Sequence, residues 1–199
     1  MTVELLLAFT LFACVTSITP GPNNTMILAS GVNFGLRRSV PHLLGISLGF
    51  GVMVAATGFG LHAVFERYPS LFEAMRWAGA AYLLWLAWKL ARSGPMADRT
   101  DEVVQPMRFF SAAAFQWVNP KAWVMAVSAI SNFLPAERSG AQVALIAALF
   151  TVINVPCVGA WAAFGSRMRN LLRDPLYLRL FNGAAALALV ASLYPLLTH

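Results

Sequence analysis

Charged residues are absent from long stretches of this chain. No Asp, Glu, Lys or Arg lies between Glu4 and Arg37, and none lies within residues 40–65. Across the 199 residues, 11% are charged and 59% are hydrophobic. A soluble domain carries about 25% charged residues, so a soluble globular fold is excluded and the chain is expected to lie in a bilayer.

Six apolar segments take up nearly the whole length. A membrane-spanning helix needs about 20 apolar residues, and long segments without short-period alternation favour helices over barrel strands. The first segment lies between Glu4 and Arg37, and the others cover about residues 40–65, 71–90, 107–134, 141–165 and 178–197. The predicted fold class is an all-α integral membrane protein with six transmembrane helices, forming one transporter domain over residues 1–199.

Lys and Arg are distributed unevenly among the connecting loops. Ten of the 14 lie in the first, third and fifth loops, three lie on the other side, and Lys121 lies within a segment. Because cytoplasmic loops carry an excess of Lys and Arg, these three loops are predicted to be cytoplasmic and both termini periplasmic. The net charge of +6 is accordingly assigned to contact with lipid headgroups and not with a nucleic acid.

Two segments are broken near their middle by proline. The first contains Pro20-Gly21-Pro22, and the fourth contains Asn119-Pro120, one hundred residues later. Each break opens a set of three helices, and successive three-helix sets must enter the membrane from opposite sides. The pattern predicts two inverted halves, about residues 1–95 and 104–199, with broken helices 1 and 4. The polar cytoplasmic loop at residues 93–106 is expected to be a flexible tether between them.

Proline can also kink a membrane helix that has no site, since neighbouring helices and water satisfy the freed backbone groups. Polar residues at both breaks favour a site here: Asn23 and Asn24 follow the first break, and Lys121 follows the second. A lysine in mid-membrane costs about 2.5–3.5 kcal/mol on insertion scales, so an idle one is unfavourable. Lys121 is predicted to bind a substrate carboxylate, and snorkelling to a headgroup is the alternative.

Four motifs in this chain resemble segments of the LysE/RhtB family of bacterial amino-acid exporters. They stand in family order, and the resemblance covers almost the full chain. The motifs are SITPGPNN at residues 17–24, GISLGF at 45–50, WAGAAYLLWLAWK at 77–89 and FQWVNPK at 115–121. The second and third segments are most similar to the cysteine and O-acetylserine efflux branch.

The resemblance implies a secondary exporter of small amino acids from the cytoplasm, in the inner membrane of a bacterium, driven by the proton gradient and without a cofactor. Carried over residue by residue, it assigns the substrate site to the positions that match the motifs. These are Thr19, Pro20, Gly21, Pro22, Asn23 and Asn24 in the first half, and Asn119, Pro120 and Lys121 in the second.

No Asp or Glu lies inside a predicted segment away from its ends, so a cationic substrate side chain would find no buried counter-charge. Neutral substrates are therefore predicted, and the resemblance implies that they are of the cysteine, O-acetylserine or homoserine/threonine type. Carboxylate proton relays are missing for the same reason. His42 and His62 are left as the proton-coupling candidates, although each position also suits an interfacial histidine.

An enzyme embedded in the membrane would need a nucleophile, metal ligands or a carboxylate pair. The sequence has no HExxH, no intramembrane Asp pair and no Gly-x-Ser-x-Gly, so neither an enzyme nor a metal site is predicted. A channel, or a structural membrane subunit without active transport, is the alternative function. The predicted partners are an amino-acid substrate and the bilayer, and a homodimer is left open by the glycine spacing of Gly45 and Gly49.

Overall fold

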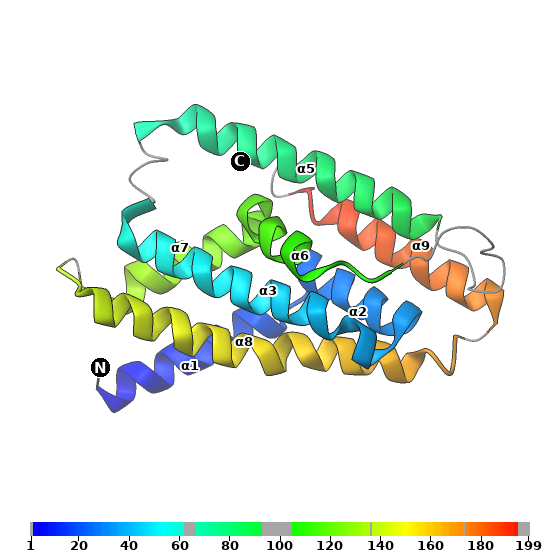
Figure 1. Ribbon diagram of the computed structural model, residues 1–199, viewed down its shortest axis with the longest axis horizontal. Coiled ribbons are helices and arrows are strands. Elements are labelled where there is room, and N and C mark those ends of the chain that lie inside the picture. Colours follow the sequence, from blue (N-terminus) through cyan, green and yellow to red (C-terminus); the bar gives the residue numbers. More distant parts are fainter. Residues whose placement is uncertain (1, 62–66, 93–104, 136, 173, 195–199) are drawn as a thin grey trace.

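The computed structural model describes residues 2–61, 67–92, 105–135, 137–172 and 174–194, and within these ranges it contains helices and no strand. The longer helices run roughly along one axis of an elongated bundle (Figure 1). The elements are α1 (Val3–Ile18), α2 (Pro22–Phe34), α3 (Leu36–Ala56), η1 (Thr57–Leu61), α5 (Pro69–Ala91), α6 (Phe109–Phe115), η3 (Gln116–Val118), α7 (Pro120–Phe133), α8 (Gly140–Met168) and α9 (Pro175–Ala191). The all-α class is therefore confirmed for the described residues.

Both predicted breaks are present. Helix α1 ends at Ile18 and α2 begins at Pro22, with a bend of 58° between them. The short helix η3 ends at Val118 and α7 begins at Pro120. Proline lacks an N–H and cannot continue the preceding helix, but its fixed φ suits the first turn of a new one. The prolines thus end one helix and start the next at both places.

The other predicted segments correspond to α3 with η1, α5, α8 and α9. By length and composition, Leu36–Leu61 and Gly140–Met168 can each cross a membrane, and Val3–Ile18 with Pro22–Phe34 adds a third span if the bent pair is one span. Phe109–Val118 and Pro175–Ala191 are shorter apolar helices. Most of the predicted tether lies outside the described residues. The six-span layout, the inverted halves and the tether stay predictions.

Helix α8 packs against α1, α2 and α3, while α5 runs beside α9 at one edge (Figure 1). The ring of Phe150 on α8 makes edge contacts with Phe9 of α1 and Phe50 of α3, at centroid separations of 5.5 and 4.8 Å. All three rings are buried. Edge-to-face pairs are a favourable aromatic arrangement, so this cluster joins the three helices.

Two glycines allow α2 and α8 to approach closely. A Cβ at Gly31 would overlap the backbone carbonyl oxygen of Ala162, and a Cβ at Gly165 would overlap that of Leu28. The obstacle is backbone in both cases, so it cannot rotate away as a side chain would. Small residues at such contacts are the usual way in which membrane helices pack closely.

Gly31→Ala and Gly165→Ala are each expected to lower the stability of the protein by about 1–3 kcal/mol, because overpacking forces the two helices apart. Gly183→Ala is the matched control, since a Cβ at Gly183 would meet nothing within 4 Å. Thermal unfolding of the three variants in detergent checks the prediction. Equal Tm values for all three would contradict a close α2–α8 contact.

Candidate functional site

The two breaks, one hundred residues apart in the sequence, meet in space. The side-chain amides of Asn23, in the first turn of α2, and Gln116, in η3, exchange two hydrogen bonds. Asn23 Nδ2 donates to Gln116 Oε1 at 2.8 Å, and Gln116 Nε2 donates to Asn23 Oδ1 at 3.2 Å. Gln116 is fully buried, and its Nε2 also donates to the carbonyl oxygen of Ala112 at 2.9 Å. The amide pair therefore joins the first break to the second.

Lys121 makes a second connection between the breaks. Its Nζ donates to Thr19 O at 2.7 Å, to Thr19 Oγ1 at 2.9 Å and to Pro20 O at 3.2 Å. An ammonium group has three N–H donors, so these oxygens can use all of them. They lie at the C-terminal end of α1, where the helix dipole is negative and a cation is favourable. Lys121 is thus held by the first break and not by a carboxylate in this structure.

Side chains also satisfy the other carbonyl groups that the first break releases. Asn24 Nδ2 donates to both Ser17 O and Thr19 O, at 2.8 Å each. The indole nitrogen of Trp161, on α8, donates to Ile18 O at 3.0 Å. An unsatisfied backbone group in a membrane interior costs several kcal/mol, so these bonds are what makes the unwound segment stable.

A buried polar chain connects the first break to α3 and α8. Asn154 Nδ2 donates to Ser17 Oγ at 3.0 Å, and Asn154 Oδ1 accepts from Ser47 Oγ at 2.9 Å. All three side chains are buried. Sequence reasoning missed Asn154, Ser17 and Gln116 as parts of the site. Asn154 is a single polar residue within an apolar run, and Ser17 and Gln116 precede the breaks, whereas the predicted residues lie at the breaks or follow them. The available signal was an isolated amide in a spanning segment, which is costly unless it is paired.

A small cavity lies where these groups converge. It holds about 20 Å³ of space for the centres of water-sized molecules, which is room for a water and not for an amino acid. Among its walls are the first turns of α2 and α7, whose N-terminal ends carry positive partial charge. Its lining residues are Thr16, Ser17, Gly21, Asn23, Asn24, Phe50, Asn119, Lys121, Ala122, Met125, Asn154 and Val158.

The structure brings the predicted substrate residues together at this cavity, which we call the central site. Five of them line it: Gly21, Asn23, Asn24, Asn119 and Lys121. Thr19 and Pro20 contact the central site through the Lys121 ammonium. Pro22 and Pro120 begin α2 and α7, and the Asn119 side chain caps α7 by accepting from Lys121 N at 3.2 Å.

Of the two predicted proton-coupling residues, His42 is described by the structure, and it does not line the central site. His42 lies in α3 and lines a second, larger cavity between α2, α3, α5, α6 and α9. His62 lies outside the described residues. No group of three or more His, Cys, Asp or Glu side chains that could hold a metal ion occurs in the part of the chain that the structure describes.

Helical proteins with apolar spans and a polar centre at paired helix breaks form a class that includes many secondary transporters. Comparison with known proteins places the chain more narrowly. Residues 14–193 match the LysE type translocator family, and the chain belongs to this family. It is a transporter family, which speaks against an enzyme.

Curated relatives match over nearly the whole chain. Proteins named cysteine/O-acetylserine efflux protein from Escherichia coli strain K12 and from Shigella sonnei strain Ss046 are each 37% identical over 194 residues, which is 96% of this chain and 96% of theirs. The same figures hold for the protein of that name from Escherichia coli O139:H28. The suspected family is therefore confirmed, and amino-acid export by these relatives supports a membrane transporter. No solved structure matches this chain.

Proposed function

We propose that this protein is a secondary active exporter of small neutral amino acids or their derivatives, of the cysteine, O-acetylserine or homoserine/threonine type. It would act in the inner membrane of a bacterium and take its substrate from the cytoplasm. The observation that carries the proposal is the contact between the breaks, in which Lys121 of the second half binds the Thr19 and Pro20 oxygens of the first. The names of the relatives support cysteine and O-acetylserine as substrates.

The proposed layout has six spans in two inverted three-helix halves, with both termini in the periplasm. The packing of equivalent helices from the two halves supports it: α3 packs against α8, and α5 packs against α9. In the same way α1 packs against α8, and α6 packs against α3. With this orientation α1 and α7 occupy the periplasmic half of the membrane, and α2 and α6 occupy the cytoplasmic half. The central site then lies near mid-membrane, where transporters of this kind bind their substrates.

The proposed binding step is an exchange of partners at Lys121. An incoming amino acid carries a carboxylate and an ammonium group. The substrate carboxylate accepts hydrogen bonds from the Lys121 ammonium. The substrate ammonium then donates to the Thr19 and Pro20 oxygens that Lys121 has released. The present cavity of about 20 Å³ is too small for an amino acid, so the central site must widen during transport.

The lining of the central site favours a neutral substrate. Among the described residues that line it there is no Asp or Glu, and Lys121 is the cation. A lysine or arginine substrate would place a second positive charge beside Lys121 without a counter-ion, which is costly in a low-dielectric site. The short side-chain amides of Asn23 and Asn24 can form hydrogen bonds with a small substrate group such as a thiol or a hydroxyl.

Proton coupling is part of the proposal, with His42 as the candidate among the described residues. Its side chain is buried and lines the larger cavity, on the side of the bundle assigned to the cytoplasm. Histidine is the side chain whose ordinary titration range lies closest to neutral pH, which suits a proton carrier. The coupling role of His62 likewise stays a prediction.

The test is efflux from proteoliposomes loaded separately with labelled cysteine, O-acetylserine, threonine, leucine and lysine, with and without a proton gradient. We expect saturable export of at least one small neutral amino acid, and we expect an uncoupler to abolish its uphill component. Flux that does not saturate would favour a channel. No flux of any solute, from protein shown to be folded and oriented, would favour a structural subunit. Preferential export of lysine would contradict the neutral-substrate argument.

Gly21→Ala tests the position of Lys121 directly. A Cβ at Gly21 would lie 2.9 Å from Lys121 Cδ, so the lysine stem must move while the backbone conformation remains accessible to alanine. We expect about a tenfold loss of export rate, because a charged hydrogen-bonding group is displaced, with little change in Tm. Gly183→Ala serves again as the control. Unchanged export by Gly21→Ala would show that the position of Lys121 is not critical.

A further inference from the structure

The larger cavity, which His42 lines, is separate from the central site. It holds about 500 Å³ for the centres of water-sized molecules, which is within the usual range of small-molecule sites. We call it the vestibule. Its apolar wall includes Met26, Leu86, Leu90, Met107 and Leu189, together with the aromatic rings of Tyr82 and Trp85. Its polar groups are Ser30, Asn33, His42, Lys89, Gln105, Arg108 and Ser111.

His42 is the most unusual group in the vestibule. It is only 2% exposed, and neither of its ring nitrogens has a hydrogen-bond partner within the described parts of the chain. A neutral imidazole has one donor and one acceptor, and burying such a group unpaired costs about 1–3 kcal/mol. Buried polar groups are nearly always hydrogen-bonded. The two unpartnered ring nitrogens of His42, at the wall of a cavity, therefore indicate that a ligand supplies their partners.

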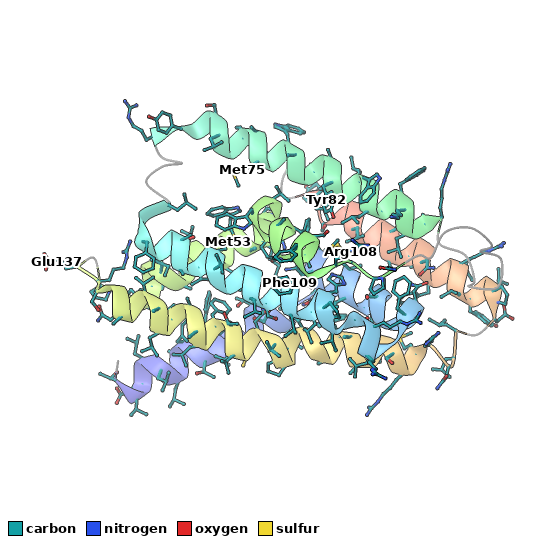
Figure 2. All side chains as sticks on the ribbon, in the orientation of Figure 1. Met53, Met75, Tyr82, Arg108, Phe109 and Glu137 are labelled. Carbon is teal, nitrogen blue, oxygen red and sulfur yellow. The ribbon has the colours of Figure 1, made fainter. Side chains whose placement is uncertain are left out.

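The charge of the vestibule defines the kind of ligand. Arg108 and Lys89 line it, and among the described residues that line it there is no Asp or Glu. Lys89 lies over the Trp85 ring at 5.1 Å, and Arg108 is the N-cap residue of α6. Figure 2 labels Arg108, and also Tyr82 of α5. A guanidinium can bind a carboxylate through two parallel hydrogen bonds.

An acceptor for an ammonium group lies in the same chamber. Asn33 Oδ1 accepts only a long hydrogen bond, 3.4 Å from Asn182 Nδ2, whereas Asn33 Nδ2 is held firmly by Ala29 O at 2.8 Å and Asn182 Oδ1 at 3.0 Å. The carbonyl oxygen of the Asn33 amide therefore has capacity for a further donor.

We propose that the vestibule is a second binding site for the exported amino acid, which it occupies before it reaches the central site. Arg108 binds the carboxylate, Asn33 Oδ1 accepts from the ammonium, and the His42 ring supplies the remaining polar contact. This inference rests on the proposed export function for the identity of its ligand. It differs from the coupling role of His42 because it requires direct contact with the solute.

The experiment measures two quantities for each variant: KM for transport from the cytoplasmic face of proteoliposomes, and Kd of labelled cysteine and O-acetylserine for the purified protein in phosphatidylcholine nanodiscs. Arg108→Gln is expected to raise KM and Kd about tenfold, as the loss of a charged hydrogen bond does, with little change in maximal rate. His42→Leu is expected to raise Kd about tenfold. Kd is the readout for this variant because His42 is also the proton-coupling candidate, so its loss is expected to lower the transport rate as well. His42→Gln keeps a donor and an acceptor and should stay within about threefold of the parent.

Arg92→Gln is the matched control, because Arg92 lies at the C-terminal end of α5, over the Trp88 ring, and does not line the vestibule. Its KM and Kd should not change. His42→Leu also separates binding from structure. Leucine removes two unpaired buried polar atoms, so Tm should stay equal or rise while affinity falls. A lower Tm that accounts for the loss of affinity would overturn the binding role.

The remaining outcomes distinguish this inference from the proposed function. If Kd is normal in Arg108→Gln and His42→Leu, KM is normal in Arg108→Gln, and the parent protein exports amino acids, the vestibule proposal is wrong and the exporter proposal holds. If the parent protein binds amino acids but transports none, and Arg108→Gln abolishes the binding, the vestibule proposal holds and the exporter proposal is wrong. A parent protein that neither binds nor moves amino acids would overturn both. A last outcome would make an anionic lipid the occupant of the vestibule. In that case phosphatidylglycerol blocks amino-acid binding by the parent protein, and Arg108→Gln weakens lipid binding only.

Discussion

Lys121→Met is expected to reduce export about 100-fold, which corresponds to the loss of one strong charged hydrogen bond of about 3 kcal/mol. Methionine keeps an unbranched stem of similar length but removes the only cation that lines the central site. The substrate carboxylate then has no positive partner, and the Thr19 and Pro20 oxygens lose the donor that Nζ provides. The measurement is the initial efflux rate in proteoliposomes, normalised to inserted protein.

The stability of this variant should change much less than its activity. Thr19 O keeps its bond from Asn24 Nδ2, and the Thr19 hydroxyl keeps its bond to Thr16 O, so Pro20 O is the one of the three oxygens that loses its side-chain donor among the described residues. Arg37→Met, at an exposed position in the first turn of α3, controls for the loss of a positive charge and should export normally. Export at the parent rate by correctly inserted Lys121→Met would remove Lys121 from the binding step.

The positions of the breaks could be predicted from the sequence, because proline has a local effect that needs no tertiary partner. Pro20, Pro22 and Pro120 remove backbone donors wherever they stand, and the structure has a helix end at each place. The apolar segments were predictable for a similar reason, since the cost of exposing backbone in lipid fixes their length and helical form. Asn23, Asn24 and Lys121 could be placed at the site because they follow the breaks directly.

The partners of those residues could not be predicted. That Asn23 pairs with Gln116, and that Asn154 joins Ser17 to Ser47, depends on how helices distant in the sequence are packed. A single amide in an apolar run shows that a partner is needed but not which one it is. The vestibule was out of reach for the same reason, since five elements contribute to it. The bonds from Lys121 to carbonyl and hydroxyl oxygens of the first break depend on the same packing and could not be predicted either, while its binding of a substrate carboxylate stays a prediction.

Asn24→Ala should have the largest effect on stability among the substitutions at the breaks, about 2–4 kcal/mol. Asn24 is 3% exposed, and its Nδ2 group bonds two carbonyl oxygens, Ser17 O and Thr19 O, across the first break. Alanine removes both bonds. Thr19 O keeps the bond from Lys121, but Ser17 O has no other side-chain donor among the described residues. A buried carbonyl without a donor lowers the stability of the folded protein by its full desolvation free energy.

Asn132→Ala is the matched control for this prediction. Asn132 lies on α7, is exposed, and donates from Nδ2 to a backbone carbonyl, Ser128 O, at 2.8 Å. The side chain and the substitution are the same, but the carbonyl it contacts belongs to a continuous helix and not to a break. Its loss should cost no more than about 0.5 kcal/mol. Denaturant or thermal unfolding in lipid nanodiscs compares the two variants.

A large loss in Asn24→Ala alone would mean that the unwound segment depends on side-chain donors, as its geometry requires. Export should then fall together with stability, since the acceptors for the substrate ammonium sit on the same segment as Ser17 and Thr19. Equal and small losses in the two variants would instead mean that water reaches Ser17 O. The central site would then be hydrated even in this conformation, and its carbonyl groups would be available to a substrate without any exchange at Lys121.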